Sequence, residues 1–146
     1  MEIAHHLENK GYTNIHVYAF DSILNDEKLL QHRQKIDDNQ FNDALKVHFM
    51  SRDYENEYIN KVITAARTEK HIVLQSPGAL KFSRVTIFKA LDKDPNFDYD
   101  GKSEFDNYLQ KIPDNNAGLY ASNVRVINLN CHHGNILEYI TPEMLE

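Results

Sequence analysis

Three short apolar runs, separated by long polar segments with helical spacing, are the feature that most limits how this chain can fold. The runs are rich in β-branched or aromatic residues, end in polar residues and cover 15–20, 71–75 and 124–129. Strands that alternate with helices in this way form a mostly parallel, doubly wound sheet, because a parallel connection has to cross back over the sheet. We therefore expect an α/β fold of three layers with about four or five strands.

The segments between these runs carry the expected helices. Residues 25–70 are polar and contain apolar stripes at helical spacing, so they predict an insert of about two or three helices after the first strand. Shorter helices are expected over 1–10, 104–112 and 135–140.

The segment 79–91 fits two kinds of element. Leu80, Ile87 and Phe88 fall on one side of a helix, which favours a helix over this range. Its many β-branched residues leave a strand as the alternative.

Length and composition indicate one globular domain over 1–146, within which 25–70 is an insert. The chain has 146 residues, of which 41% are hydrophobic and 26% charged, values typical of globular proteins. No apolar run approaches the length of about 20 residues that would span a bilayer, so no membrane contact is expected. The N-terminus lacks the pattern of a secretory signal, and the one cysteine, Cys131, cannot form an internal disulfide. Both features favour the cytoplasm.

The charge balance argues against a nucleic-acid partner. Sixteen Lys and Arg residues face 22 Asp and Glu residues, which gives a net charge of -6. Proteins that bind a polyphosphate backbone need a broad basic face, which this balance does not favour. A local basic pocket is compatible with this balance: Lys81, Arg84 and Lys89 form a modest group of basic residues that could hold a phosphate, although a solvated surface is the more usual explanation of such a group.

Polar residues at the strand ends are the candidates for a functional site, because doubly wound sheets bind ligands at the carboxyl ends of their strands. Asp21 follows the first run, and Ser76 follows the second. Lys102 opens the helix near 104, and Asn130 with Cys131 follows the last run. The structural alternative is that Asp21 or Ser76 caps a helix with its side-chain oxygen.

The order of these residues resembles the motifs of the haloacid dehalogenase superfamily of phosphohydrolases. Asp21 lies in Val-Tyr-Ala-Phe-Asp-Ser-Ile-Leu and matches the first aspartate of the family's Asp-x-Asp motif. Ser76 ends a hydrophobic run as in the second motif, and Lys102 opens a helix as in the third. Residues 128–136 stand where the fourth motif is found, and 25–70 would correspond to a helical cap.

The resemblance implies roles for these side chains. Asp21 would be the nucleophile or a metal ligand, and Ser76 and Lys102 would be catalytic residues that hold the phosphoryl oxygens. Asn130 would remain as a contact on the metal side.

Two departures from the family pattern weaken the expected activity. The family's second aspartate donates a proton to the leaving group, and Ile23 in its place cannot do so. The acids of the fourth motif normally complete a Mg²⁺ site, whereas Asn130 and Cys131 provide no such charge. Binding of Mg²⁺ by Asp21 and Asn130 is therefore expected to be weak or absent. Three further carboxylates could restore the metal site: Asp43, Asp98 and Asp100.

These features predict a degenerate member of the superfamily that recognises a phosphate ester, with weak or absent Mg²⁺-dependent hydrolysis through Asp21. The alternative is a non-catalytic module on the same scaffold, which would bind a protein partner or regulate one through its helical insert or its tyrosine-rich surface. The number of acids around Asp21 distinguishes the two hypotheses.

The sequence Cys131-His132-His133 suggests a further, separate chemistry. A neighbouring imidazole could lower the pKa of the Cys131 thiol and make it a nucleophile. A partly buried cysteine at the end of a strand is the simpler interpretation.

Overall fold

A computed structural model of residues 1–146 describes the whole chain except 24–26, 36, 51–53, 72–77 and 96–101. The chain divides into two compact units. The first contains Met1–Leu24, Gln75–Lys93 and Leu109–Glu146, and the second contains Asn25–Leu74 and Asp94–Tyr108. Among the described helices, none is long and apolar enough to cross a membrane.

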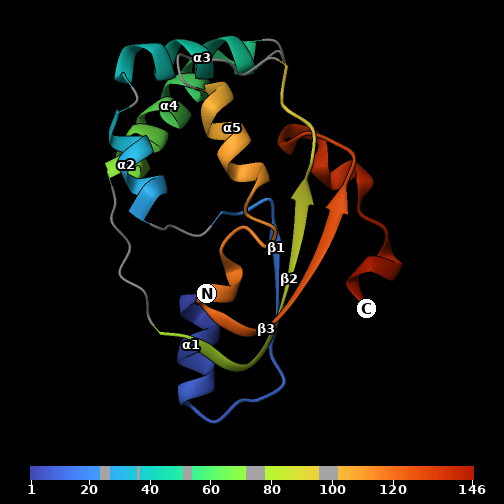
Figure 1. The fold of residues 1–146 in the computed structure, drawn as a ribbon. Coiled ribbons are helices and arrows are strands. Elements are labelled where there is room, and N and C mark those ends of the chain that lie inside the picture. Colours follow the sequence, from blue (N-terminus) through green and yellow to red (C-terminus); the bar gives the residue numbers. More distant parts are fainter. Residues whose placement is uncertain (24–26, 36, 51–53, 72–77, 96–101) are drawn as a thin grey trace. The chain divides into compact units, whose positions relative to one another are not determined.

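A parallel sheet forms the centre of the first unit (Figure 1). The described residues give it three strands in the order β1-β2-β3, namely β1 (His16–Phe20), β2 (Leu80–Ala90) and β3 (Ala121–Leu129). β1 pairs with β2 from His16 opposite Arg84 onward, and β2 pairs with β3 as far as Ala90 opposite Leu129. Because the strands are parallel, their carboxyl ends lie at one edge of the sheet. The predicted α/β class and parallel pairing are confirmed.

The helix expected over 79–91 is wrong, and its strand alternative is correct. β2 is the central strand, and its segment 85–89 is buried without interruption. A strand buried on both faces shows no polar alternation, so its apolar spacing can imitate a helical stripe. The β-branched residues Val85, Thr86 and Ile87 carry the signal that identifies the strand.

The strand expected over 71–75 does not begin at residue 71. His71 is the last residue of α4 (Asn56–His71). Residues 72–75 lie outside the described part of the chain.

The second unit is built from helices. The predicted insert contains α2 (Glu27–Lys35), α3 (Asp38–Met50) and α4, and most of α5 (Lys102–Gln110) belongs to the same unit. The apolar stripes seen in the sequence supply its buried side chains, which include Leu29, Ala44, Ile59 and Ile63.

Two apolar clusters flank the sheet of the first unit. One contains Val85 and Ile87 of β2 and is covered by α1 (Glu2–Asn9) and η1 (Ala117–Leu119); its buried members are Ala4, Leu80, Val85, Ile87, Ala117 and Ala121. The other contains Phe88 and is covered by the short helices η2 (His133–Tyr139) and η3 (Pro142–Leu145); its buried members are Phe88, Leu129, Cys131 and Ile136. Alternate side chains of β2 thus enter opposite clusters, as the pleat of a strand requires.

Glu8, near the end of α1, binds the start of β2. Its Oε1 accepts hydrogen bonds from the N–H of Phe82 at 2.9 Å and from the N–H and hydroxyl of Ser83, each at 2.6 Å. Its Oε2 accepts a bond from the N–H of Lys81 at 2.9 Å. β1 begins to pair with β2 only at Arg84, so this carboxylate takes the place of a strand partner for the preceding N–H groups.

These hydrogen bonds also control the ionisation of Glu8. Desolvation on burial acts to raise the pKa of its carboxyl group, but the bonds from Ser83, Lys81 and Phe82 outweigh it and lower the pKa from 4.5 to about 2. Because the pKa is lower in the folded chain, the stabilisation is present above pH 4.5 and is lost as the pH falls from 4.5 toward 2.

We expect Glu8→Ala to lower the free energy of unfolding by about 1 to 3 kcal/mol at neutral pH, since it leaves several backbone donors without their charged acceptor. Glu2→Ala, on the same helix but exposed, should change it by less than about 0.5 kcal/mol. Urea unfolding followed by circular dichroism measures both. Wild type should also lose stability between pH 4.5 and 3 in excess of Glu8→Ala; equal losses in the two proteins would contradict this role.

Candidate functional site

Asp21 and His133 meet at the carboxyl edge of the sheet. Asp21 directly follows β1, and His133 lies beyond the end of β3, so the two residues come from the strands on either side of β2. The Nδ1 atom of His133 is 3.0 Å from Oδ2 of Asp21. The side chain of Asp21 is 17% exposed and that of His133 is 72% exposed, so the acid lies beneath an imidazole that solvent can reach.

The end of β2 fixes the position of Asp21. Its N–H donates to the carbonyl of Phe88 at 2.7 Å, and its Oδ1 accepts from the N–H of Ala90 at 3.2 Å. Asp21 has φ of 46°, in the left-handed region that aspartate tolerates better than most residues. The chain therefore turns sharply out of β1 while the carboxylate stays bound to the neighbouring strand.

A local capping arrangement fixes the backbone beside His133. The Nδ1 atom of His132 accepts from the N–H of Gly134, and Oδ1 of Asn135 accepts from the N–H of His132, each at 3.1 Å. This capping box begins η2 at His133. The geometry assigns a structural role to His132 and directs the adjacent imidazole to Asp21.

Cys131 lies in the apolar cluster beside this pair. Its side chain is buried, and burial raises the pKa of the thiol, with further contributions from the negative charges of Asp21 and Asp92. A thiol in this environment is a poor nucleophile, as the interpretation of a buried cysteine at a strand end expects.

Lys89 is a buried lysine near the same edge. Its ammonium group donates to the carbonyls of Leu109, at 3.3 Å, and Ile112. Burial lowers the pKa of Lys89, while the charges of Asp21 and Asp114 act in the opposite direction. The residue expected on a basic surface face is thus an internal group that binds the carbonyls at the end of α5.

The other predicted site residues are not seen to converge. Ser76 lies outside the described residues. Lys102 opens α5 as predicted, but it belongs to the second unit, where its ammonium group is 2.6 Å from a carboxylate oxygen of Asp106. Asn130 is exposed in the bend after β3. The convergence of Asp21, Ser76 and Lys102 therefore stays a prediction.

The described residues do not form a recognisable metal site. Within the described ranges, no three His, Cys, Asp or Glu side chains are grouped so that they could hold a metal ion. Asp43 lies on α3 with 74% of its side chain exposed, and its carboxylate is 3.8 Å from the ammonium group of Lys46. Asp98 and Asp100 are among the residues not described. Asp21 with Asn130 does not provide the set of anionic oxygens that Mg²⁺ prefers.

Sequence reasoning considered His133 only as a neighbour of Cys131, and missed it as the partner of Asp21. The available signal was its place after the last strand of a parallel sheet, since the ends of all parallel strands lie at one edge. That signal becomes specific only once the strand order is known.

No protein-family model matches this chain, and no curated protein matches it.

We expect Cys131 to react slowly with a thiol reagent in the folded protein. Because the thiol is buried and its pKa is raised, labelling at about pH 8 should be at least about tenfold slower than in the urea-unfolded chain. The measurement is unambiguous because the chain has one cysteine, and Cys131→Ser provides the blank. Equal rates in folded and unfolded protein would instead indicate an accessible, reactive thiol.

Proposed function

We propose that the protein recognises a phosphate ester at the edge of the sheet where Asp21 and His133 meet, and hydrolyses it weakly or not at all. The observation that carries this proposal is the 3.0 Å contact between these two side chains at the edge where parallel sheets bind their ligands. We propose the scaffold to be a degenerate member of the haloacid dehalogenase superfamily, with three layers and 25–70 as its helical cap. We also propose a cytoplasmic location, which the single cysteine supports.

His133 would make the direct contact with the phosphoryl group. An ionised carboxylate only accepts hydrogen bonds, so Nδ1 of His133 donates to Asp21 and Nε2 is the atom that changes protonation. The charged ring can donate from Nε2 to a phosphoryl oxygen, and the adjacent carboxylate stabilises that charge. The neutral ring can instead accept a proton from a water molecule that attacks phosphorus.

Weak or absent turnover through Asp21 follows from its surroundings. Both of its oxygens already accept hydrogen bonds, one from Ala90 and one from His133, and these bonds withdraw electron density and make the carboxylate a weaker nucleophile. Ile23 supplies no proton to the leaving group. In this proposal Ser76 and Lys102 hold phosphoryl oxygens, and Mg²⁺ binding at Asp21 and Asn130 is weak or absent.

A protein-binding or regulatory module is the second candidate, and one surface feature favours it. Tyr54, just before α4 of the second unit, and Tyr58, in its first turn, are 45% and 50% exposed, with ring centroids 5.1 Å apart. The ring of Phe49 lies edge-on to Tyr54 at 5.9 Å. Clustered tyrosines of this kind are enriched at protein interfaces.

Hydrolysis of p-nitrophenyl phosphate tests the proposal, because its good leaving group does not depend on a proton donor. We expect a slow rate in wild type, with or without Mg²⁺, and a fall of at least about tenfold in Asp21→Asn and in His133→Gln. His6→Gln, an exposed histidine on α1, is the matched control and should keep the wild-type rate.

Where no turnover is detected, binding decides between the candidates. Phenyl phosphate should then shift the imidazole NMR signals of His133 in wild type, and this shift should be lost in Asp21→Asn. Equal background rates in all proteins, together with an unperturbed His133, would reject the phosphate-ester site and favour the protein-binding module.

A further inference from the structure

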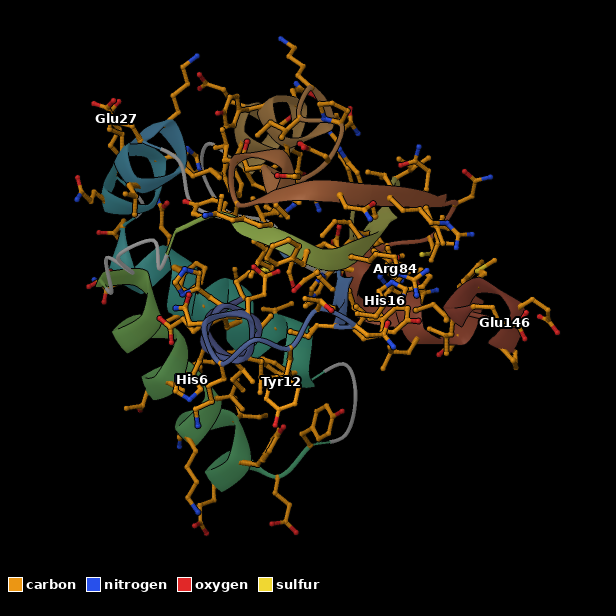
Figure 2. The ribbon with its side chains drawn as sticks, turned by 90° about the horizontal axis from the view of Figure 1, so that it is seen from below. His6, Tyr12, His16, Glu27, Arg84 and Glu146 are labelled. Carbon is orange, nitrogen blue, oxygen red and sulfur yellow. The ribbon has the colours of Figure 1, made fainter. Side chains whose placement is uncertain are left out.

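Three basic side chains from three different strands gather on one face of the sheet. His16 of β1 pairs with Arg84 of β2, and Thr86, two residues further along β2, pairs with Arg125 of β3. Residues paired across parallel strands, and residues two apart along a strand, point to the same face. Figure 2 shows His16 and Arg84 side by side. We call His16, Arg84 and Arg125 the basic face.

The basic face occupies the half of this surface that the C-terminal segment does not cover. Toward the carboxyl ends, Tyr18 and Phe88 are packed under η2 and η3, and the hydroxyl of Tyr18 donates to the carbonyl of Leu145. Toward the amino ends, Arg84 and Arg125 are both exposed. Both guanidinium groups can therefore be reached by a ligand.

No carboxylate of the described residues forms an ion pair with either arginine. This is notable in a chain with six more acids than bases (22 against 16). The two arginines are also close enough to His16 to lower its pKa, after the larger effect of burial. Like charges held together without an anionic partner repel one another, and a bound anion would relieve that repulsion.

The imidazole is held in place at the base of this surface. The Nε2 atom of His16 is 2.9 Å from the hydroxyl oxygen of Thr86, which is itself buried, and the ring lies 4.0 Å from that of Tyr18. When the Thr86 hydroxyl donates to Nε2, the proton of the neutral ring is on Nδ1, where it can be donated to a ligand.

We propose that the basic face is a binding site for the phosphate group of a small phosphomonoester. Two guanidinium groups match the geometry of phosphate oxygens, because each can donate two parallel hydrogen bonds. His16 provides a further donor, and Asn123, paired with Arg84 and exposed, provides an amide at the rim.

The size of the basic face favours a small ligand over a nucleic acid. A polynucleotide is bound by a stripe of basic residues that follows its backbone, and two arginines on a chain of net charge -6 do not provide one. A dianionic monoester matches the two arginines in charge, whereas a diester carries a single negative charge.

This site is separate from the pair formed by Asp21 and His133. His16 and Asp21 are five positions apart, which along a strand corresponds to roughly 16 Å, too far for one phosphate group to contact both. Phosphate binding at the basic face is therefore independent of the function proposed for Asp21 and His133.

Titration with inorganic phosphate, followed by calorimetry and by the imidazole NMR signals of His16, tests the site. Wild type should show saturable binding that shifts His16. Arg84→Gln and Arg125→Gln should each weaken it at least about tenfold, and the double variant at least about a hundredfold. Arg84→Lys, which keeps the charge but loses the paired donors, should fall between wild type and Arg84→Gln.

The controls distinguish phosphate binding at the basic face from general charge effects, from misfolding and from binding at Asp21 and His133. Lys10→Gln removes one exposed positive charge of the same unit and should leave phosphate affinity within about twofold of wild type. The arginine variants should melt at or above the wild-type temperature without phosphate, because no ion pair to a carboxylate is lost, but should not be stabilised by phosphate as wild type is. Asp21→Asn should keep full binding at His16.

Several results would overturn the inference. These are no saturable binding of phosphate by wild type, unchanged affinity in the double variant, or loss of binding in Asp21→Asn. Phenyl phosphate should bind more tightly than dimethyl phosphate or a short single-stranded oligonucleotide; the reverse order would indicate a nucleic-acid surface instead.

Discussion

The pairing of β2 on both sides is the constraint on which the first unit depends. β2 forms hydrogen bonds with β1 and with β3, and its segment 85–89 is buried from both faces. Because side chains alternate along a strand, this segment supplies Val85 and Ile87 to one apolar cluster and Phe88 to the other. The same pairing aligns the ends of all three strands, so Asp21 after β1 can bind Ala90 at the end of β2 and meet His133 beyond β3.

Carboxylates complete the sheet where backbone pairing is missing. Glu8 binds the N–H groups of β2 before β1 begins, and Asp21 binds the N–H of Ala90 after β1 ends. Asp114 likewise accepts from the N–H groups of Asn116 and Gly118 at the turn into η1. Part of the negative charge of the chain is therefore used to satisfy backbone donors, while the positive charge of Arg84 and Arg125 is left without a carboxylate partner among the described residues.

Local sequence signals predicted the helices that have one apolar and one polar side, and the strands whose apolar runs end in polar residues. The β-branched and aromatic runs over 15–20 and 124–129, which end in polar residues, predicted β1 and β3, and the apolar stripes within 25–70 predicted a helical insert that contains α2, α3 and α4. β2 was expected only as the alternative to a helix, because burial on both faces removes the alternation by which strands are recognised. Lys89 shows the same limit: a lysine in sequence indicates a surface position, and only the carbonyls of Leu109 and Ile112 make its burial possible.

The sequence by itself determined that this chain is an α/β protein with a parallel sheet, and that Asp21 stands at the end of a strand, because both follow from the order of apolar runs and polar breaks. Only the tertiary structure decided that Asp21 meets His133, and that His16, Arg84 and Arg125 share one face. Both groupings join residues far apart in the chain, and their proximity depends on strand order and register. Both are properties of the pairing of β1, β2 and β3, whose partner residues lie far apart in the sequence.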